Sequence, residues 1–344
     1  MQYEPPFKIT SKAINLISRI SEKIGEIHNF VNTAHSVQLR KKNRIKTIHS
    51  SLAIENNSLT IEQITAIIEG KRVLGSPNEI REVKNAVQAY ELLLTLNPYQ
   101  EKDLLQAHHL MMNNLVNHSG KYRGDGVGIF DGRNVVHVAP PADRVPSLMS
   151  DLFQWLKDTD THPLIKSSVF HYEFEFIHPF EDGNGRMGRL WQTVILKDWK
   201  AFFAWLPVET LIKEHQNEYY QALSLSDANS DSTAFIEFML SVILNTIESI
   251  LATESKITAK ITAKITANQQ KIIQAIKDNP YITQEELAAV VGIARLNIIK
   301  NMKKLQEHHI ITRVGADKNG YWRVEAKLIT SCADGASAKN PTRL

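Results

Sequence analysis

The sequence predicts a mostly α-helical protein that carries one β-hairpin near its middle and a smaller α+β domain at its C-terminus. Three observations predict this fold class. Apolar residues recur at helical spacing through most of the chain. A valine-rich stretch from Val127 to Val138 surrounds Asp131-Gly132, a strong hairpin signal. Near Ala252 the composition changes, and a separate pattern of short helices and strands follows.

The bulk composition is typical of a globular protein with a sizeable core. The 344 residues are 43% apolar and 22% charged, and this length favours two or three domains. The formal net charge of +3 is too small to predict nucleic-acid or membrane binding by the chain as a whole.

The single cysteine, Cys332, excludes an intrachain disulfide and a cysteine-built zinc site, and it favours a reducing, cytoplasmic compartment. No basic region followed by an apolar run begins the sequence, so no secretory signal is expected. The apolar stretch Ala234–Leu251 contains Glu237 and Glu248. It is interpreted as a buried helix, and no membrane partner is expected.

The first elements are helices. A capping box at Thr60-Ile-Glu-Gln63 predicts the start of a short helix that ends at Gly70. Amphipathic patterns predict two further helices, over Glu79–Leu96 and Glu101–Asn117. The first of these ends before Pro98.

The hairpin follows over Val127–Val138 and ends at Pro140-Pro141. Helical patterns then resume over Val145–Lys157 and Pro163–Phe176, and after a polar loop over Gly185–Trp199.

A four-residue repeat over Ile257–Ala267 has a period close to one helical turn, and it predicts a linker helix. The alternative is a slipped repeat whose only role is spacing. Beyond it, helices over Lys271–Lys277, Thr283–Gly292 and Ala294–Glu307 precede two strands over Ile310–Val324. Helix, helix-turn-helix and hairpin in this order predict a winged helix.

The segment Ile177–Arg189 carries the residues for chemistry. His178 lies in a loop ahead of a helix, and Gly183-Asn184-Gly185 stands where the chain enters that helix. Glycines let backbone N–H groups converge as a nest, and a helix N-terminus adds partial positive charge. This turn is therefore suited to phosphate.

Charged residues surround this turn. Asp182 is suited to a hard cation such as Mg²⁺, and Arg186 and Arg189 are spaced to face one anion from the same side of a helix. A base, a phosphate nest, a cation ligand and two arginines together predict group transfer from a nucleotide.

The stretch from His178 to Arg189 resembles the signature of the Fic family, His-x-Phe-x-(Asp/Glu)-Gly-Asn-Gly-Arg-x-x-Arg, at every fixed position. The similarity extends from the N-terminal helices to about Leu251. The resemblance implies a mostly helical Fic domain with a β-hairpin flap. It also implies an enzyme that transfers AMP from ATP to a Ser, Thr or Tyr hydroxyl of a target protein, with Mg²⁺ as cofactor.

The resemblance also implies roles for single residues. His178 would be the general base, Asp182 would hold Mg²⁺, and Phe180 would be a buried anchor of the loop. The ATP-binding stretch would comprise Gly183, Asn184, Gly185, Arg186, Met187, Gly188 and Arg189. The backbone amides of the first three would form an anion hole. Arg186 would contact the β-phosphate, and Arg189 would contact the γ-phosphate.

Two further features are implied by the resemblance. A target segment would pair with the edge of the flap at 127–138, which is β-augmentation. The alternative is a plain structural hairpin. Tyr219 and Tyr220 would contact the nucleobase, and the alternative is that both are ordinary core tyrosines.

Upstream, Ser51-Leu-Ala-Ile-Glu55-Asn56 resembles the inhibitory pattern of the family, (Ser/Thr)-x-x-x-Glu-(Gly/Asn). It implies that Glu55 pairs with Arg189, so that Arg189 no longer grips the γ-phosphate. The alternative is an ordinary solvated glutamate on a helix.

The expected organisation is an N-terminal region over 1–100 with the inhibitory motif, a catalytic core over 101–252, a linker helix over 253–267, a winged helix over 268–325 and a disordered tail over 326–344.

A homodimer is one candidate partner. DNA is another, through residues 268–325, whose third helix carries Arg295, Lys300, Lys303 and Lys304. The alternative role of this module is dimerisation or domain packing.

Other functions remain open at this point. One is a DNA-binding regulator that senses nucleotide, and others are removal of AMP or a different phosphotransfer, as in Doc kinases and phosphocholine transferases. His178 and Asp182 favour an enzyme, and the retained Gly-Asn-Gly favours AMP.

Overall fold

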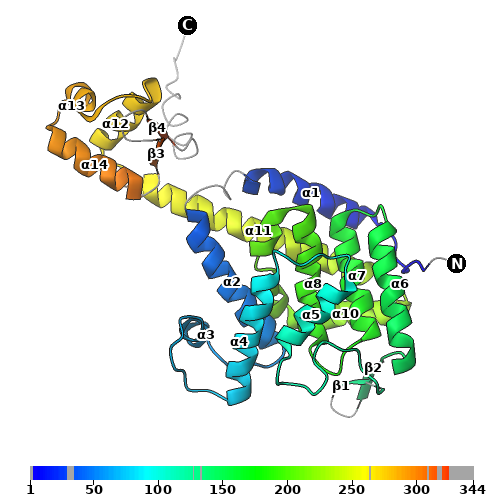
Figure 1. Cartoon of the computed structure of the whole chain (residues 1–344). Helices are drawn as coiled ribbons and strands as arrows, with labels where there is room; N and C mark the ends of the chain where they lie inside the picture. Colours follow the sequence, from blue (N-terminus) through cyan, green and yellow to red (C-terminus); the bar gives the residue numbers. More distant parts are fainter. Residues whose placement is uncertain are drawn as a thin grey trace, which may run out of the picture. The chain divides into compact units, whose positions relative to one another are not determined.

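The computed structural model describes residues 3–28, 35–126, 128–131, 134–262, 265–307, 310–315 and 320–324. These form two compact units: the larger contains residues 3–28 and 36–248, and the smaller contains residue 35 and the described residues from 249 to 324. The predicted fold class, mostly α with a hairpin and a C-terminal winged helix, is confirmed (Figure 1).

The larger unit is built mainly from helices. In chain order its elements are α1 (Ser11–His28), α2 (His35–Ile54), α3 (Ile61–Ile68), α4 (Pro77–Leu92), α5 (Glu101–Met111), β1 (Gly128–Asp131), β2 (Asn134–Val138), the 3₁₀ turn η1 (Ala142–Arg144), α6 (Val145–Asp158), α7 (Pro163–Ile177), α8 (Asn184–Trp199), the 3₁₀ turn η2 (Ala201–Trp205), α9 (Val208–Glu214), α10 (Gln216–Asn229) and the first part of α11 (Thr233–Thr262).

Helices α7 and α8 form the centre of this unit, and they pack against each other (Figure 1). Nearly every residue of α8 up to Leu196 is buried, including its two arginines. A helix that is buried on all sides is held firmly by its neighbours. The loop between α7 and α8 is therefore anchored at both ends by the core.

The predicted hairpin is present as the antiparallel pair β1–β2, which pairs Gly128 with Val138 and Asp131 with Asn134. A bulge between Ile129 and Phe130 breaks the regular register. Val127 and residues 132–133 of the predicted turn lie outside the described residues.

Some helix boundaries agree with the sequence and others do not. The capping boxes predicted at Thr60 and Thr283 are both formed, with each threonine hydroxyl accepting an amide three residues later. By contrast, α5 ends at Met111, six residues earlier than predicted, and Asn114 beyond it has a left-handed φ of 56°. A residue in that conformation cannot continue a helix.

Helix α11 contains Thr233–Thr253, which is the one helical segment of the described chain long and apolar enough to cross a membrane by length and composition. Half of this segment is buried inside the fold. Its apolar residues, such as Phe235 and Leu240, are fully covered, as in the core helix of a globular unit.

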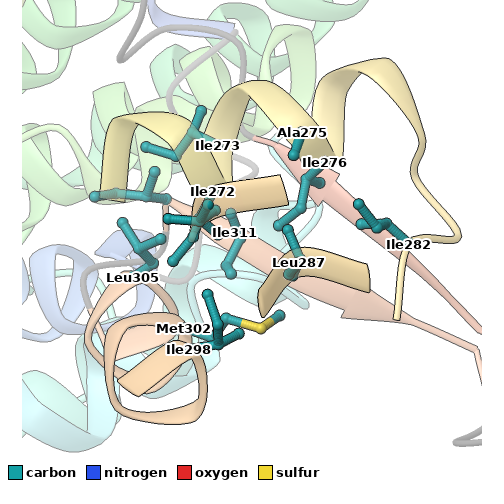
Figure 2. Packing of buried hydrophobic residues seen from close by; sticks show 12 residues of the cluster. Ile272, Ile273, Ala275, Ile276, Ile282, Leu287, Ile298, Met302, Leu305 and Ile311 are labelled. Carbon is teal, nitrogen blue, oxygen red and sulfur yellow. The ribbon is translucent and has the colours of Figure 1, made fainter. Parts of the chain in front are cut away.

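The smaller unit contains α12 (Ala267–Asp278), α13 (Gln284–Val291), α14 (Arg295–Glu307) and the antiparallel strands β3 (Ile311–Val314) and β4 (Tyr321–Val324). Figure 2 shows its apolar core, in which Ile276, Leu287 and Ile298 from the three helices are fully buried. Gly292 ends α13 in a left-handed conformation with a φ of 77°. Residues 316–319, between the two predicted strands, and the predicted tail at 326–344 lie outside the described residues.

The predicted linker helix is part of α11 as far as Thr262, and residues 263–264 lie outside the described residues. Helix α12 begins at Ala267, four residues before the predicted Lys271. Thr266 forms a capping box with Gln269, which the sequence analysis missed inside the repeat.

Candidate active site

His178 lies directly after α7, at the start of the loop that leads to α8. It has a left-handed conformation, with φ 49° and ψ 61°, and its amide donates to the carbonyl of Phe174 at 3.0 Å. The residue is half-buried. A non-glycine residue in this conformation persists only where its surroundings hold it.

The loop after His178 is closed by Asn184. The Asn184 Oδ1 atom accepts from the amide of Phe180 at 2.9 Å, and its Nδ2 atom donates to the carbonyl of Phe180 at 2.9 Å. Phe180 is fully buried, as predicted. Only the backbone of Asn184 was expected to have a role, whereas its side chain fixes the shape of the loop.

His108, on α5, packs against the same loop. Its ring stacks on Phe180, with centroids 3.6 Å apart and planes within 6°. The amide of Gly120 donates to His108 Nδ1 at 2.8 Å, so Nε2 carries the proton and donates to the carbonyl of Asp182 at 3.1 Å. Burial lowers the pKa of His108 to about 4, which keeps the ring neutral.

Gly183 starts α8 in a left-handed conformation with a φ of 85°. A Cβ atom at this position would lie 2.7 Å from the Sδ atom of Met112, so only glycine fits. The Oδ1 atom of Asp182 accepts from the Gly183 amide at 2.5 Å. The next amides belong to the first turn of the helix, where N–H groups have no intrahelical acceptor.

Arg186 is buried beneath this turn between two carboxylates. Its Nη2 atom lies 3.0 Å from Asp182 Oδ1, and its Nη1 atom lies 3.6 Å from Glu82 Oε1. Glu82 also accepts from Asn57 Nδ2 at 2.7 Å. Arg186 is thereby linked to the segment that follows the predicted inhibitory motif, a link that the sequence analysis missed.

Arg189 is buried and contacts the inhibitory motif at the end of α2. Its Nη2 atom lies 2.8 Å from Glu55 Oε1 and donates to the carbonyl of Ser51 at 2.9 Å, while Nε donates to Ser51 Oγ at 3.3 Å. Burial would lower the pKa of Arg189, but the charge and hydrogen bond of Glu55, together with Tyr219 and Glu175, outweigh the burial and raise that pKa. The predicted ion pair is thus present, and its inhibitory role stays a prediction.

Two residues next to the ion pair of Glu55 and Arg189 are suited to it. A Cβ atom at Gly185 would lie 2.5 Å from Glu55 Oε1 and 3.0 Å from Arg189 Nη1, so the absence of a side chain there makes room for the pair. Asn56, the last residue of the motif, has a left-handed φ of 67° and ends the helical segment.

The remaining predicted residues differ in burial. Met187 is fully buried, and a Cβ atom at Gly188 would lie 2.7 Å from Glu175 Oε1. Tyr219 is buried, with its hydroxyl 3.2 Å from His171 Nε2, whereas Tyr220 is 45% exposed. Contacts of these residues with ATP stay predictions.

The donor groups at this loop fit a magnesium ion shared with phosphate. Within the described ranges, no three His, Cys, Asp or Glu side chains gather in a way that could hold a metal ion alone. Asp182 is a single carboxylate whose side chain is 59% exposed. Mg²⁺ usually binds through one or two carboxylates, with substrate phosphates and water as its other ligands.

Comparison with known proteins identifies the family. Residues 98–196 match the family model described as Fic/DOC family. The crystal structure of a Fic family protein from Desulfovibrio desulfuricans G20 is 44% identical in sequence, covers 94% of this chain and 99% of that chain, and has a TM-score of 0.71. The chain belongs to the Fic family.

This Fic protein is also similar to curated relatives named protein adenylyltransferase Fic. The one from Nematostella vectensis is 27% identical over 70% of this chain and 58% of its own length. The one from Culex quinquefasciatus is 24% identical over 79% of this chain and 52% of its own length. The chain therefore spans about half the length of these relatives. Residues 265–312 match a second family model, described as winged helix-turn-helix DNA-binding.

Proposed function

We propose that this Fic protein is an adenylyltransferase that moves AMP from ATP to a Ser, Thr or Tyr hydroxyl of a target protein. The observation that carries the proposal is the turn at Gly183. It presents the N-terminus of α8, has His178 just before it, and has Arg186 and Arg189 on the first turns of the helix. The names of the relatives favour AMP transfer over other phosphoryl chemistry.

The proposed reaction is one displacement at the α-phosphorus. His178 takes the proton from the target hydroxyl, whose oxygen forms a bond to the α-phosphorus while the bond to pyrophosphate breaks. Positioned proton transfer of this kind contributes about 10²- to 10⁴-fold to a rate. Holding both reactants in line supplies much of the remaining acceleration.

The chain's own groups supply the charge stabilisation. The amides at the start of α8 bind phosphate oxygens, and Arg186 and Arg189 bind the β- and γ-phosphates. Mg²⁺ held by Asp182 would neutralise negative charge on the phosphates.

In this proposal Glu55 restrains the enzyme through Arg189. With its guanidinium held at 2.8 Å from Glu55, Arg189 is not available to the γ-phosphate, and the carboxylate repels that phosphate. ATP then binds with its α-phosphorus out of line, and a displacement of about 1 Å costs on the order of 10²-fold in rate.

Glu55→Gly is expected to raise transfer of label from α-labelled ATP on the order of 10- to 100-fold, and His178→Ala is expected to abolish it. Mass spectrometry should find one AMP on a hydroxyl side chain. The control is Glu69→Gly, which replaces another glutamate at a helix C-terminus, there paired with Lys71. No gain with Glu55→Gly, or an equal gain with Glu69→Gly, contradicts the inhibitory role.

We further propose that the smaller unit binds duplex DNA. Its α14 follows the left-handed Gly292 as the second helix of a helix-turn-helix, and its exposed face carries Lys300, Lys303 and Lys304. Arg295 on the same helix is paired with Glu285 at 2.9 Å. The match to a DNA-binding family model supports this second role.

A duplex titration of the whole protein at two salt concentrations tests this role. Phosphate contacts release counterions, so the affinity should fall steeply as salt rises. Lys300→Ala should weaken binding and reduce the salt slope by about 1, whereas Lys277→Ala on α12 should leave both unchanged. Binding that is absent at low salt, or equal for wild type and Lys300→Ala, contradicts the proposal.

A further inference from the structure

We propose that Arg123 is a positioning residue that couples the β-hairpin to the loop of His178, so that the hairpin controls the placement of the imidazole. The inference rests on the proposed function, and it takes the hairpin as the docking site of the target protein, as the resemblance to the Fic family implies. Arg123 lies outside the signature, in the segment between α5 and β1.

On one side, Arg123 holds three consecutive carbonyl groups at the end of α7. Its Nε atom donates to the carbonyl of His178 at 2.7 Å, and Nη2 reaches the carbonyl of Ile177 at 3.3 Å. Its backbone amide donates to the carbonyl of Pro179 at 2.9 Å. The peptide groups on both sides of His178 are therefore fixed by one residue.

On the other side, the same guanidinium holds both ends of the hairpin. Its Nη1 atom donates to the carbonyl of Asp125, which precedes β1, at 2.8 Å. Its Nη2 atom donates to the carbonyl of Pro140, which follows β2, at 2.5 Å. The hairpin and the His178 loop thus meet at a single planar group.

The environment makes these contacts strong. Arg123 is only 6% exposed, and burial lowers the pKa of its guanidinium. Hydrogen bonds from a charged donor are roughly twice as strong as neutral ones, and the planar fork of arginine fixes the relative directions of its acceptors. Moving one acceptor therefore disturbs the others.

His178 needs such support because of its backbone. Left-handed non-glycine residues are strained and persist where the surrounding structure over-determines them. Fixing the His178 carbonyl also fixes the direction in which its side chain leaves the backbone. A target strand that pairs with the hairpin and shifts Pro140 would shift the imidazole through Arg123.

Kinetics distinguish positioning from a merely structural role. In a Glu55→Gly background, Arg123→Ala is expected to lower kcat by about 10- to 100-fold and to leave KM for ATP within about twofold. The hydrogen bonds of Arg123 go to residues 125, 140 and 177–179 and not to the phosphate turn. Arg123→Lys should recover part of kcat. The control Arg81→Ala removes a single bond to the carbonyl of Asn114 and should match the background. An unchanged kcat, or a loss of kcat with a parallel rise in KM for ATP, overturns the proposal.

Amide hydrogen exchange of the full chain tests the coupling without any activity. Arg123→Ala should speed exchange both in the hairpin, over 134–138, and in the loop, over 177–180, while α13 and α14 stay unchanged. Faster exchange in the hairpin alone overturns the coupling. If both segments respond but Glu55→Gly transfers no AMP, the proposed function fails and the coupling stands.

Discussion

His108 is a buried histidine whose two ring nitrogens are both used by the backbone. One accepts the amide of Gly120 and the other donates to the carbonyl of Asp182. A protonated ring would carry a second N–H in place of the acceptor that Gly120 needs, inside a site that excludes water. The residue therefore ties the fold of the loop to the protonation state of one imidazole.

Stability is expected to fall in acid because of His108. Its pKa is about 4 in the folded chain, against 6.5 for a free histidine, so the unfolded state binds the proton first as pH falls. The stabilisation is complete above pH 6.5, and about 3 kcal/mol of it is lost between pH 6.5 and 4. Denaturant unfolding of the larger unit, in the wild type and in His108→Gln, measures this loss of stability. The difference in free energy between the two should shrink by that amount, and a pH-independent difference contradicts it.

The residues of the signature could be predicted because their chemistry is local. Within twelve residues the sequence holds His178, the turn and both arginines, and the pairing of Arg189 with Glu55 followed from a short upstream motif. His108 and Arg123 could not be predicted. Each acts on the backbone of a loop more than 50 residues away, and no spacing rule links a side chain to a distant carbonyl group.

At the level of elements, the helix starts at Thr60 and Thr283 were predictable, whereas the start of α12 and the end of α5 were not. The capping boxes at Thr60 and Thr283 each lie within four residues, so they can be recognised directly in the sequence. The end of α5 depends on tertiary contacts. Asn85 on α4 donates to the carbonyls of Met111 and Asn113, which takes over acceptors that a longer helix would have used. The apolar pattern continues past Met111 and gave no sign of this.

At the level of the whole molecule, the chain forms two compact units with separate apolar cores. The boundary falls inside α11, because a helix runs on through the point where the composition changes. The change in composition near Ala252 and the four-residue repeat that follows it predicted a domain boundary between residues 252 and 253.

Leu287→Ala is expected to destabilise the smaller unit alone. Leu287 is fully buried in the cluster of Figure 2, and removing such a side chain costs about 2–5 kcal/mol. Calorimetry of the full chain should show one transition moving to lower temperature while the transition of the larger unit stays in place. Transfer of AMP should be unchanged. A common shift of both transitions would show that the units unfold together.

The contact between Glu55 and Arg189 joins positions 134 residues apart within one polypeptide. A tethered pair of this kind meets at an effective concentration set by the fold, so dilution does not separate it and abundant expression does not reinforce it. For the inhibition proposed above, the amount of restraint per molecule would be fixed at synthesis. Release would then have to come from something that competes for the guanidinium or shifts the last turn of α2, and not from a change in copy number.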